Sequence, residues 1–358
     1  MVILSREFRA LGVQAEVATF GNSEHFTSGP DAPKIVRLSA ARALTSLIPL
    51  ALHLRRTRPD WVISAQNFAN IIAVMANLLA GRPSKVIVTE RNAVSRERGT
   101  YAGLLGAGRL KGRVLLLLMR LIYPWADRIA ANAGDGARDL AETIGLSPSQ
   151  VRVLYNPTFD PGLLEAGEAE MGNASHPFLN GAGGALVIAV GRLAPQKDFG
   201  TLIRAFALVR AHIPCRLLIL GEGPDRTALE ALTRSLGVEA DIAFPGFLEN
   251  PHALVRRADL FVLSSLFEGL PNALIEAVAL GVPCVSTDCL SGPREILLDG
   301  RGGILVPVGD PQRLAAGILE SLQNPDQARA LLSVARSGLY RFDSRTAAKA
   351  YLLCMEGQ

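Results

Sequence analysis

The sequence predicts an α/β protein built from two doubly wound domains in tandem. Three observations lead to this fold class: a length of 358 residues, short apolar runs that alternate with helical patterns, and a break in this alternation over roughly 156–184. Such a length suits two domains, and short apolar strands between helices are typical of parallel sheets. We therefore expect a first domain over 1–160, a linker over 161–184 and a second domain from residue 185 onward.

The first domain is expected to begin inside a helix. A doubly wound domain normally opens with a strand and a Gly-rich turn, and neither precedes the helical pattern at 1–11. Either translation starts late in this sequence or the domain lacks its first strand, so we expect a truncated first domain. The later elements are predicted as strands over 14–20, 61–64, 85–89, 128–131 and 151–154, and as helices over 38–57, 67–80, 110–125 and 135–144.

The second domain repeats the pattern more regularly. Strands are predicted over 186–190, 216–220, 242–244, 260–264 and 284–286, and helices over 199–212, 226–236, 254–257 and 273–280. The carboxyl ends of parallel strands meet at one edge of a sheet, so a ligand is expected there, in a cleft between the two domains.

Composition restricts the classes of function. Residues 1–160 carry a net charge of +8 and the remainder −4. The first half is therefore expected either to meet an anionic partner or to carry an ordinary basic surface. No apolar run is long enough to span a bilayer, and no stretch resembles a signal peptide. The four cysteines and five histidines lack the spacing of metal ligands, so we expect no metal and a reduced cytoplasmic compartment.

The segment 190–199 joins a predicted strand to a helix. Gly191 permits a tight turn, Arg192 and Lys197 place two cations at the strand end, and Asp198 is predicted to cap the helix. Two cations beside a helix N-terminus suit a diphosphate, whose developing negative charge they would neutralise without a metal. By itself this short pattern is more typical of surface charge.

A second strand-to-helix turn follows at 220–224. Its Gly221 and Gly223 would allow a ligand to approach the backbone closely. Tight turns of this kind occur in many α/β proteins, so the pair supports a ligand site without establishing one.

The strongest signal is the loop and helix start at 267–276. Glu268 can accept hydrogen bonds from sugar hydroxyls, and Glu276, one turn into the helix, can accept a pair from a ribose diol. Taken alone, Glu276 is more typical of an exposed carboxylate near a helix start. Amides at this helix start can meet phosphate or sugar oxygens. The loop residues expected around the ligand are Gly269, Leu270, Pro271, Asn272 and Ala273.

Four segments of the second half closely resemble the donor domain of retaining family-four glycosyltransferases. They are VGRLAPQKDFGTLIRAF, LLILGEGP, FEGLPNALIEAVALGVPCVSTDCLSGPREIL and GILVPVGD, and the resemblance covers essentially all of 185–345. It implies the GT-B type of fold, with two Rossmann-like domains facing a cleft. The second domain would then span 185–341, and the tail at 342–358 resembles a final helix that crosses back onto the first domain.

The resemblance also implies a reaction, the transfer of a hexose from a nucleotide diphosphate with retention of configuration. In this family the residues that match Arg192 and Lys197 bind the donor diphosphate. Those that match Glu268 and Glu276 contact the donor sugar and the ribose. No metal or other cofactor is implied.

In the first half, the segment 86–92 (VIVTERN) resembles relatives that build lipid-linked oligosaccharides and surface polysaccharides. Glu90, Arg91 and Asn92 are therefore acceptor-side candidates, although a structural strand cap fits them nearly as well. The segment 291–296 (SGPREI) is similar to the same subgroup, whose donors are often UDP-linked galactose, GlcNAc or GalNAc. The implied partners are a UDP-sugar and a glycan or polyprenyl-diphosphate-linked acceptor. The family's Gly-rich loop would precede Met1.

Residues 109–125 combine a strongly apolar run with Arg109, Lys111, Arg113 and Arg120. This pattern fits a core helix with a basic end, and it equally fits a helix that lies on an anionic membrane. In the second case the protein would be peripheral on the cytoplasmic face of the inner membrane.

Three other functions remain as alternatives. The first keeps the donor pocket without transfer, as an impaired nucleotide-sugar-binding remnant or a partner-dependent subunit. An NAD-dependent dehydrogenase would need a G-x-G-x-x-G turn after a strand, and no turn in the sequence carries one. A nucleic-acid binder is disfavoured because the basic excess lacks a recognisable reading module.

Overall fold

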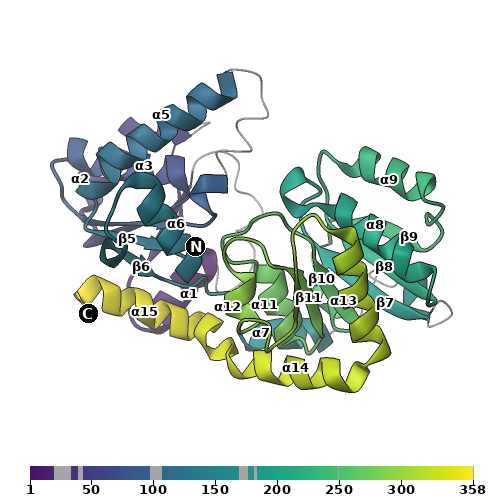
Figure 1. Cartoon of the computed structure of the whole chain (residues 1–358). Helices are drawn as coiled ribbons and strands as arrows, with labels where there is room; N and C mark the ends of the chain where they lie inside the picture. The colour runs from purple at the N-terminus through teal and green to yellow at the C-terminus, as the bar shows by residue number, and fades with distance from the viewer. Residues whose placement is uncertain are drawn as a thin grey trace. The chain divides into compact units, whose positions relative to one another are not determined.

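The computed structural model describes residues 1–19, 34–38, 43–96, 107–168, 176–180, 184–248 and 250–357 (Figure 1). The chain forms two compact units. The first comprises Met1–Pro157 together with Ser344–Gln358, and the second comprises Thr158–Asp343. Each unit is built on a parallel sheet covered by helices, which confirms the predicted α/β class. Among the described residues, every helix is too short or too polar to cross a lipid bilayer.

The first unit contains a four-stranded parallel sheet in the order β3-β4-β5-β6 and a separate parallel pair, β1 and β2. Its strands are β1 (Glu16–Thr19), β2 (Lys34–Arg37), β3 (Trp61–Ala65), β4 (Lys85–Glu90), β5 (Arg128–Ala131) and β6 (Val151–Val153). Its helices and 3-10 turns are α1 (Val2–Ala10), η2 (Ala43–Ser46), α2 (Leu47–Thr57), α3 (Asn67–Leu79), α5 (Ala107–Ile122), η3 (Tyr123–Trp125), α6 (Gly134–Ile144), η4 (Pro148–Gln150) and α15 (Ser344–Glu356).

Strand β4 shows why this sheet is covered on both faces. Its side chains alternate between the faces, and the consecutive residues Val86, Ile87 and Val88 are all buried. Val86 and Val88 pack in a cluster with residues of α3, α5 and α6, whereas Ile87 packs with residues of α1 and α15. Helices α1 and α15 lie side by side (Figure 1), and the rings of Phe8 and Tyr351 meet edge to face with their centroids 6.5 Å apart. The C-terminal helix therefore completes the core of the first unit.

The second unit contains a six-stranded parallel sheet in the order β12-β11-β10-β7-β8-β9. Its strands are β7 (Ala185–Val190), β8 (Cys215–Leu220), β9 (Ile242–Gly246), β10 (Leu260–Leu263), β11 (Cys284–Thr287) and β12 (Ile304–Val306). Its helices and 3-10 turns are α7 (Pro161–Glu168), η6 (Pro177–Asn180), η7 (Pro195–Lys197), α8 (Phe199–Arg210), α9 (Arg226–Ser235), α10 (His252–Val255), α11 (Asn272–Ala279), α12 (Pro293–Ile296), α13 (Pro311–Gln323), α14 (Pro325–Ser337) and η8 (Leu339–Phe342).

The strand order of this sheet defines one switch point. From β7 the chain adds β8 and β9 on one side, and it then returns to the other side of β7 with β10, β11 and β12. Because β7 and β10 are neighbours and the chain continues from them to opposite sides of the sheet, their carboxyl ends mark the place at which doubly wound sheets usually bind ligands. This topology points to the loops after β7 and β10.

Several predicted boundaries need correction. Part of the expected linker at 161–184 is the helix α7, which packs against α10 and belongs to the second unit, so this part of the prediction is wrong. Residues 169–175 and 181–183 of that range lie outside the described residues. So do Phe20, the last residue of the predicted strand at 14–20, and residues 39–42 of the predicted helix at 38–57. The elements β2, β12, α12, α13 and α14 were not predicted from the sequence.

Candidate functional site

The loops that follow β7 and β10 are joined to each other by hydrogen bonds. The amide of Leu266 donates to the carbonyl of Gln196 at 2.8 Å, and the Gln196 side chain donates to the carbonyl of Phe267 at 3.0 Å. The hydroxyl of Ser264 donates to the carbonyl of Lys197 at 2.7 Å. These bonds connect the turn η7 to the start of the 267–276 segment, so two predicted site segments are adjacent at the switch point.

Lys197 and Glu268 form an ion pair at this junction. The Lys197 Nζ lies 2.5 Å from Glu268 Oε1, which also accepts a hydrogen bond from the Ser265 hydroxyl at 2.7 Å. The two side chains are only 18% and 7% exposed. The ammonium reaches this position by passing over Gly191, where an added Cβ would come within 3.0 Å of Lys197 Cε. A cation and a carboxylate are therefore held together in a partly desolvated place at the strand ends.

The backbone around Lys197 fixes its direction. Asp198 follows η7 in the left-handed region, at φ 43°, where the chain turns into α8. Its carboxylate accepts hydrogen bonds from the Thr201 amide at 3.2 Å and the Thr201 hydroxyl at 2.6 Å. Asp198 is thus the N-cap of α8, as predicted, and it anchors the turn that carries Lys197.

Glu268 is held from its other side by the segment after β11. Phe267 and Leu290 form an isolated parallel bridge, and the Glu268 amide donates to the carbonyl of Leu290 at 3.2 Å. Beside them, burial and the negative charge of Glu268 raise the pKa of the Cys289 thiol to about 12. Glu268 consequently sits in a largely dry environment.

Arg192 lies at the end of β7 and is exposed. Among the described residues its guanidinium has no hydrogen bond or ion pair, which leaves its donors accessible to a ligand. Its neighbour Leu193 is fixed, because the Leu193 amide donates to the carbonyl of Glu222 at 2.9 Å. The second predicted cation is therefore exposed at its tip, while the backbone beside it is anchored.

Gly221 and Gly223 have a structural role that the sequence did not predict, while the approach of a ligand to them stays a prediction. An added Cβ at Gly221 would lie 2.0 Å from the carbonyl oxygen of Gly191, and one at Gly223 would lie 2.2 Å from that of Leu193. Gly221 also has φ +137°, which side chains rarely adopt. The two glycines allow the loop after β8 to pack on the loop after β7. The close approach that they permit is to protein backbone.

The start of α11 presents backbone to the site. Pro271 is the N-cap, and its carbonyl accepts the first hydrogen bonds of the helix from Leu274 and Ile275, so the amides of Asn272 and Ala273 precede these bonds. Leu270 and Pro271 are buried, Ala273 is half-buried and Asn272 is exposed. A ligand would therefore meet mainly main-chain atoms here.

The loop before α11 is supported from beneath. The hydroxyl of Ser291 donates to the carbonyl of Gly269 at 2.7 Å. Gly292, at φ +96°, leaves no room for a side chain, because an added Cβ would lie 2.4 Å from Pro271 Cδ. The segment 291–296 that sequence analysis singled out therefore supports the Gly269–Pro271 turn.

Glu276 has a partner that sequence analysis did not identify. Nε2 of His252, the first residue of α10, lies 3.5 Å from Glu276 Oε2, and about a quarter of each side chain is exposed. His252 lies near Glu276 because α10 packs against α11. A contact of this kind leaves no motif in the sequence by which His252 could be identified. The pair leaves the other carboxylate oxygen of Glu276 for a ligand.

In the first unit, Glu90 does not face solvent. It is buried at the end of β4 and accepts hydrogen bonds from Asn70 Nδ2, at 3.0 Å, and from the hydroxyl of Tyr123. Asn70 and Tyr123 are also buried, in α3 and η3. This network ties β4 to two helices, so the prediction that Glu90 contacts an acceptor is not supported, and the structure favours a structural role.

Arg91 and Asn92 follow at the same strand end and are half-buried. Nη1 of Arg91 donates to the side chain of Asn156, and its Nη2 lies 3.3 Å from the sulfur of Met1. Its Nε is buried without a hydrogen-bond partner among the described residues. Arg91 and Asn92 thus remain candidates for an acceptor side.

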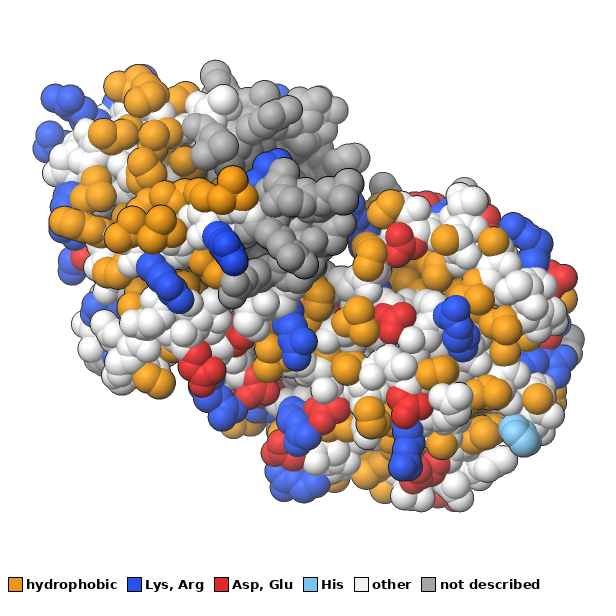
Figure 2. All heavy atoms as spheres, turned by 45° about the horizontal axis from the view of Figure 1, so that its top comes forward, with side chains coloured by type: hydrophobic (Ala, Val, Ile, Leu, Met, Phe, Trp, Pro, Cys, Tyr) orange, Lys and Arg blue, Asp and Glu red, His pale blue; other side chains and the backbone are white. Residues whose placement is uncertain are grey.

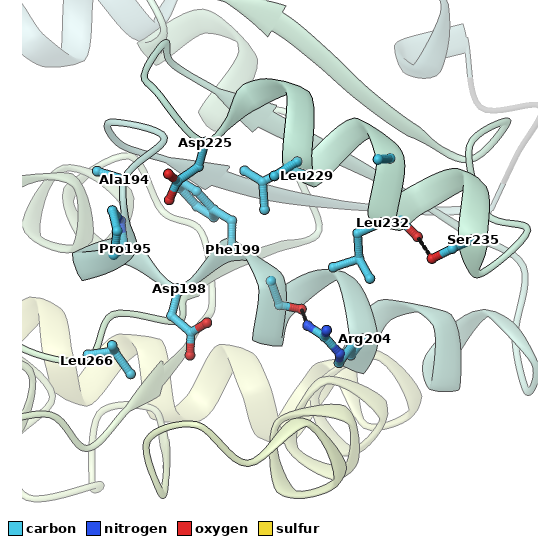
Figure 3. A pocket seen from close by; sticks show the side chains of 13 residues that line it. Ala194, Pro195, Asp198, Phe199, Arg204, Asp225, Leu229, Leu232, Ser235 and Leu266 are labelled. Carbon is cyan, nitrogen blue, oxygen red and sulfur yellow. Dashed lines mark hydrogen bonds between the residues drawn. The ribbon is translucent and has the colours of Figure 1, made fainter. Parts of the chain in front are cut away.

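A groove on the second unit lies apart from the ion pair and from Glu276. It has a volume of about 710 Å³ and runs between α8 and α9, beside the turn η7 (Figure 3). Asp198 and Arg204 line it, but both are engaged, Asp198 as the cap of α8 and Arg204 with the carbonyl of Gly200 at 3.2 Å. The groove includes none of Lys197, Glu268 and Glu276, so its size does not make it the functional site. In the described part of the chain, no group of three or more His, Cys, Asp or Glu side chains could hold a metal, and metal independence stays a prediction.

Two family models match the two halves of the chain. Residues 184–324 match the model described as "Glycosyl transferases group 1", and residues 1–158 match "Glycosyltransferase Family 4". The segment 184–324 contains every candidate residue of the second unit.

Similar proteins are found among curated sequences. An N-acetylgalactosaminyltransferase of Campylobacter jejuni, whose name gives a diphospho-undecaprenol-linked acceptor, is 29% identical over 77% of this chain and 71% of its own length. An uncharacterised glycosyltransferase of Methanocaldococcus jannaschii is 29% identical over 68% of this chain. The match spans 59% of the length of that second relative.

Solved structures share the fold. HepE of Anabaena, determined in complex with UDP, superposes with a TM-score of 0.75 at 20% identity and covers 99% of this chain and 94% of that one. Sucrose-phosphate synthase of Thermosynechococcus elongatus reaches 0.79 at 17% identity, with 99% and 92% covered. These identities support the architecture alone. Taken with the two family models, they show that the chain belongs to the glycosyltransferases of the GT-B fold, with a family-four first half and a group 1 second half.

Proposed function

We propose that this glycosyltransferase transfers a hexose from a UDP-sugar, with retention of configuration, to a glycan or lipid-linked acceptor in polysaccharide or oligosaccharide biosynthesis. The observation that carries the proposal is the Lys197–Glu268 pair at the switch point of the second unit. The pair supports the proposal because a cation could meet the diphosphate of a nucleotide sugar and a carboxylate could accept hydrogen bonds from its hexose.

Lys197 and Arg192 would hold the donor diphosphate. When the bond between the anomeric carbon and the diphosphate breaks, negative charge builds on the departing oxygen. A cation held in a dry site by Glu268 is preorganised to stabilise that charge, since little reorganisation is needed during the reaction. Arg192 is exposed and adds a second charge with several donors. Two such cations would serve in place of a metal, and no cofactor is proposed.

Glu268 and Glu276 would orient the rest of the donor. Glu268 retains a second carboxylate oxygen beyond the one bound by Lys197 and Ser265, and that oxygen can accept hydrogen bonds from hexose hydroxyls. Glu276, steadied by His252, can accept hydrogen bonds from the ribose diol. The amides of Asn272 and Ala273 at the start of α11 would meet phosphate oxygens or sugar hydroxyls. The site thus offers a group for each part of the donor.

The acceptor is proposed from the first half of the chain. This half matches the Family 4 model, and the Campylobacter relative is named for a diphospho-undecaprenol-linked substrate. Arg91 and Asn92, at the carboxyl end of β4, are the residues best placed to meet such an acceptor. Polyprenyl diphosphates reside in membranes, so the enzyme would work in the cytoplasm, peripheral to the inner membrane.

A panel of nucleotide sugars tests the proposal. Binding is measured by calorimetry and transfer by release of the nucleoside diphosphate, first for the native chain and then for Lys197→Ala and Glu276→Ala. Each substitution removes a group that contacts the donor, so we expect at least a tenfold loss of affinity, about 1.4 kcal/mol, for the preferred UDP-sugar. Arg336→Ala, an exposed substitution at the end of α14, is the control and should bind normally.

The outcome separates the proposal from its rival. Unchanged affinity in both variants would show that the site is assigned wrongly. Tight donor binding with no release of UDP, whatever the acceptor supplied, would favour an impaired or partner-dependent nucleotide-sugar binder.

A further inference from the structure

Buried hydroxyl groups distinguish the ends of two strands in the second unit. On the face of this unit that Figure 2 shows, acidic, basic and hydrophobic side chains are interspersed. In the interior, at the carboxyl ends of β10 and β11, four hydroxyl residues are at most 1% exposed: Ser264, Ser265, Ser286 and Thr287. A buried hydroxyl costs free energy unless it is hydrogen-bonded. Each of these residues therefore needs a partner that an apolar residue in its place would not need.

The hydroxyl of Ser265 differs from the other three in its partner. The hydroxyl of Ser286 donates to the carbonyl of Thr287 at 2.9 Å, and the hydroxyl of Thr287 donates to the carbonyl of Ser265 at 2.6 Å. The hydroxyl of Ser264 also donates to a carbonyl, in the loop after β7. Within this group of described residues, only the hydroxyl of Ser265 donates to a charged side chain, at 2.7 Å from Oε1 of Glu268.

The carboxylate of Glu268 is thereby fixed through one of its two oxygens. Oε1 accepts from both Lys197 and Ser265, which leaves Oε2 for a ligand. The last torsion of a glutamate side chain has only a broad, two-fold preference, so bonds from its surroundings decide where each oxygen points. Ser265 is a firm donor because Thr287 holds its own main chain. Two donors on one oxygen thus set the direction of the other oxygen.

The two donors differ in what a nucleotide sugar would do to them. A diphosphate carries more negative charge than one carboxylate, so it would draw the ammonium of Lys197 away from Glu268. The hydroxyl of Ser265 is neutral and fully buried, and it would stay on Oε1.

Building on the proposed function, we propose that Ser265 is a positioning residue: its hydroxyl holds the carboxylate of Glu268 toward the hexose while Lys197 binds the diphosphate. Ser265 acts through Glu268, which meets the hexose. The UDP part of the donor therefore binds independently of the Ser265 hydroxyl.

Calorimetric binding of UDP and of the preferred UDP-sugar tests the proposal. Ser265→Ala keeps the Cβ and removes the hydroxyl. We expect the Kd for the UDP-sugar to rise about five- to tenfold, with the Kd for UDP within about twofold of the native value. The kcat/KM for transfer should fall by a factor similar to the rise in the Kd for the UDP-sugar. Ser265→Cys fills the same space with a weak donor and should show the same split, and it carries the test if Ser265→Ala proves unstable. In a Glu268→Ala background, Ser265→Ala should change neither Kd by more than about twofold, because the group on which it acts is gone.

Two other buried serines serve as controls. Ser344 in α15 of the first unit is 2% exposed and also donates its hydroxyl to a glutamate, Glu7, at 3.1 Å. Ser344→Ala should bind UDP and the UDP-sugar as the native chain does. Ser286→Ala removes a hydroxyl from the same strand ends without a direct bond to Glu268, so it should change the two Kd values by the same factor. Far-UV circular dichroism checks that every variant is folded.

The outcomes separate this positioning role from the proposed function. If the native chain binds no nucleotide sugar, the proposed function fails and the role of Ser265 fails with it. If the native chain binds a UDP-sugar but Ser265→Ala raises both Kd values equally, or acts as strongly in the Glu268→Ala background, only the role of Ser265 is refuted. Native UDP-sugar affinity in Ser265→Cys would also refute it, because the size of the side chain and not its hydrogen bond would then matter.

Discussion

The Lys197–Glu268 pair can be dissected by substituting each partner alone and both together. Lys197→Met keeps an unbranched side chain to lie over Gly191 but removes the ammonium that is 2.5 Å from Glu268. Among the described residues, the buried carboxylate then keeps only the hydroxyl of Ser265 as a hydrogen-bond donor. Breaking a fully buried pair costs about 3–5 kcal/mol. Since Lys197 is 18% exposed and water can partly replace it, we expect the second unit to lose about 2–3 kcal/mol.

The double variant, Lys197→Met with Glu268→Gln, should recover much of this loss. Glutamine has no charge to leave unpaired, and its carbonyl can still accept the hydrogen bond from Ser265. We expect a coupling free energy of about 1–2 kcal/mol between the two positions. Affinity for a UDP-sugar should not recover, because both variants lack the cation that meets the diphosphate.

Urea titration measures the stability of Lys197→Met, of Glu268→Gln and of the double variant. Trp61 and Trp125, the two tryptophans of the chain, belong to the first unit, so their fluorescence follows that unit alone, whereas far-UV circular dichroism follows both. The substitutions should shift the dichroism transition and leave the fluorescence transition in place. A coupling free energy within about 0.5 kcal/mol of zero would refute the reasoning, because it would mean that Glu268 does not need Lys197.

Three further predictions concern the same unit. Gly221→Ala should lower the free energy of unfolding of the second unit by about 2–4 kcal/mol in urea titration, because φ +137° strains a side chain and the new Cβ meets the Gly191 carbonyl. The control Gly237→Ala, also at positive φ but in open space, should cost only about 1–2 kcal/mol. Equal losses in the two variants would contradict the contact with Gly191. His252→Ala should raise the calorimetric Kd for UDP about two- to fivefold with an unchanged rate of transfer, because His252 positions Glu276. His252→Gln should retain most of the affinity. A fall in the rate of transfer alone would contradict this positioning role. Burial raises the thiol pKa of three cysteines of the second unit, to about 11 for Cys215, to about 12 for Cys289, and also for Cys284. As the pH rises, the unfolded chain therefore loses these protons before the folded chain does. The free energy of unfolding from urea titrations should be full below about pH 8.5 and should fall as the pH rises above it. These thiols should also resist a thiol reagent until the unit unfolds, and rapid reaction in the folded protein would show that they are accessible.

The fold could be predicted from the sequence wherever a strand is an uninterrupted apolar run. β4, β7 and β10 are buried on both faces, and their sequences show it. The strand β12 (Ile304–Val306) is only three residues long, at the edge of the sheet, and two of its residues are partly exposed, so its pattern is too short to read. Helix α7 was missed because Pro and Gly at its start imitate a linker, whereas its helicity is supported by packing against α10.

The site was predictable to the extent that it depends on residues near strand ends. Lys197 and Glu268 each follow a strand that could be identified, and the resemblance to a family supplied their roles. Their mutual contact depends on β7 and β10 being neighbours, which is a property of strand order. His252 was missed for the same reason, since it meets Glu276 only through the packing of α10 against α11.

Gly221 and Glu90 show that a residue type typical of function can also have a structural explanation. A glycine at a strand end can admit a ligand or another loop, and the structure shows the second, because a Cβ added at Gly221 would lie 2.0 Å from the Gly191 carbonyl oxygen. A carboxylate at a strand end can face solvent or the interior, and the hydrogen bonds from Asn70 and Tyr123 decide for the interior. Both residues still serve the site indirectly. Gly221 holds together the loops that carry the cations, and Glu90 ties the strand end that bears Arg91 to α3 and η3. Substituting either residue should therefore alter stability before it alters affinity for any ligand.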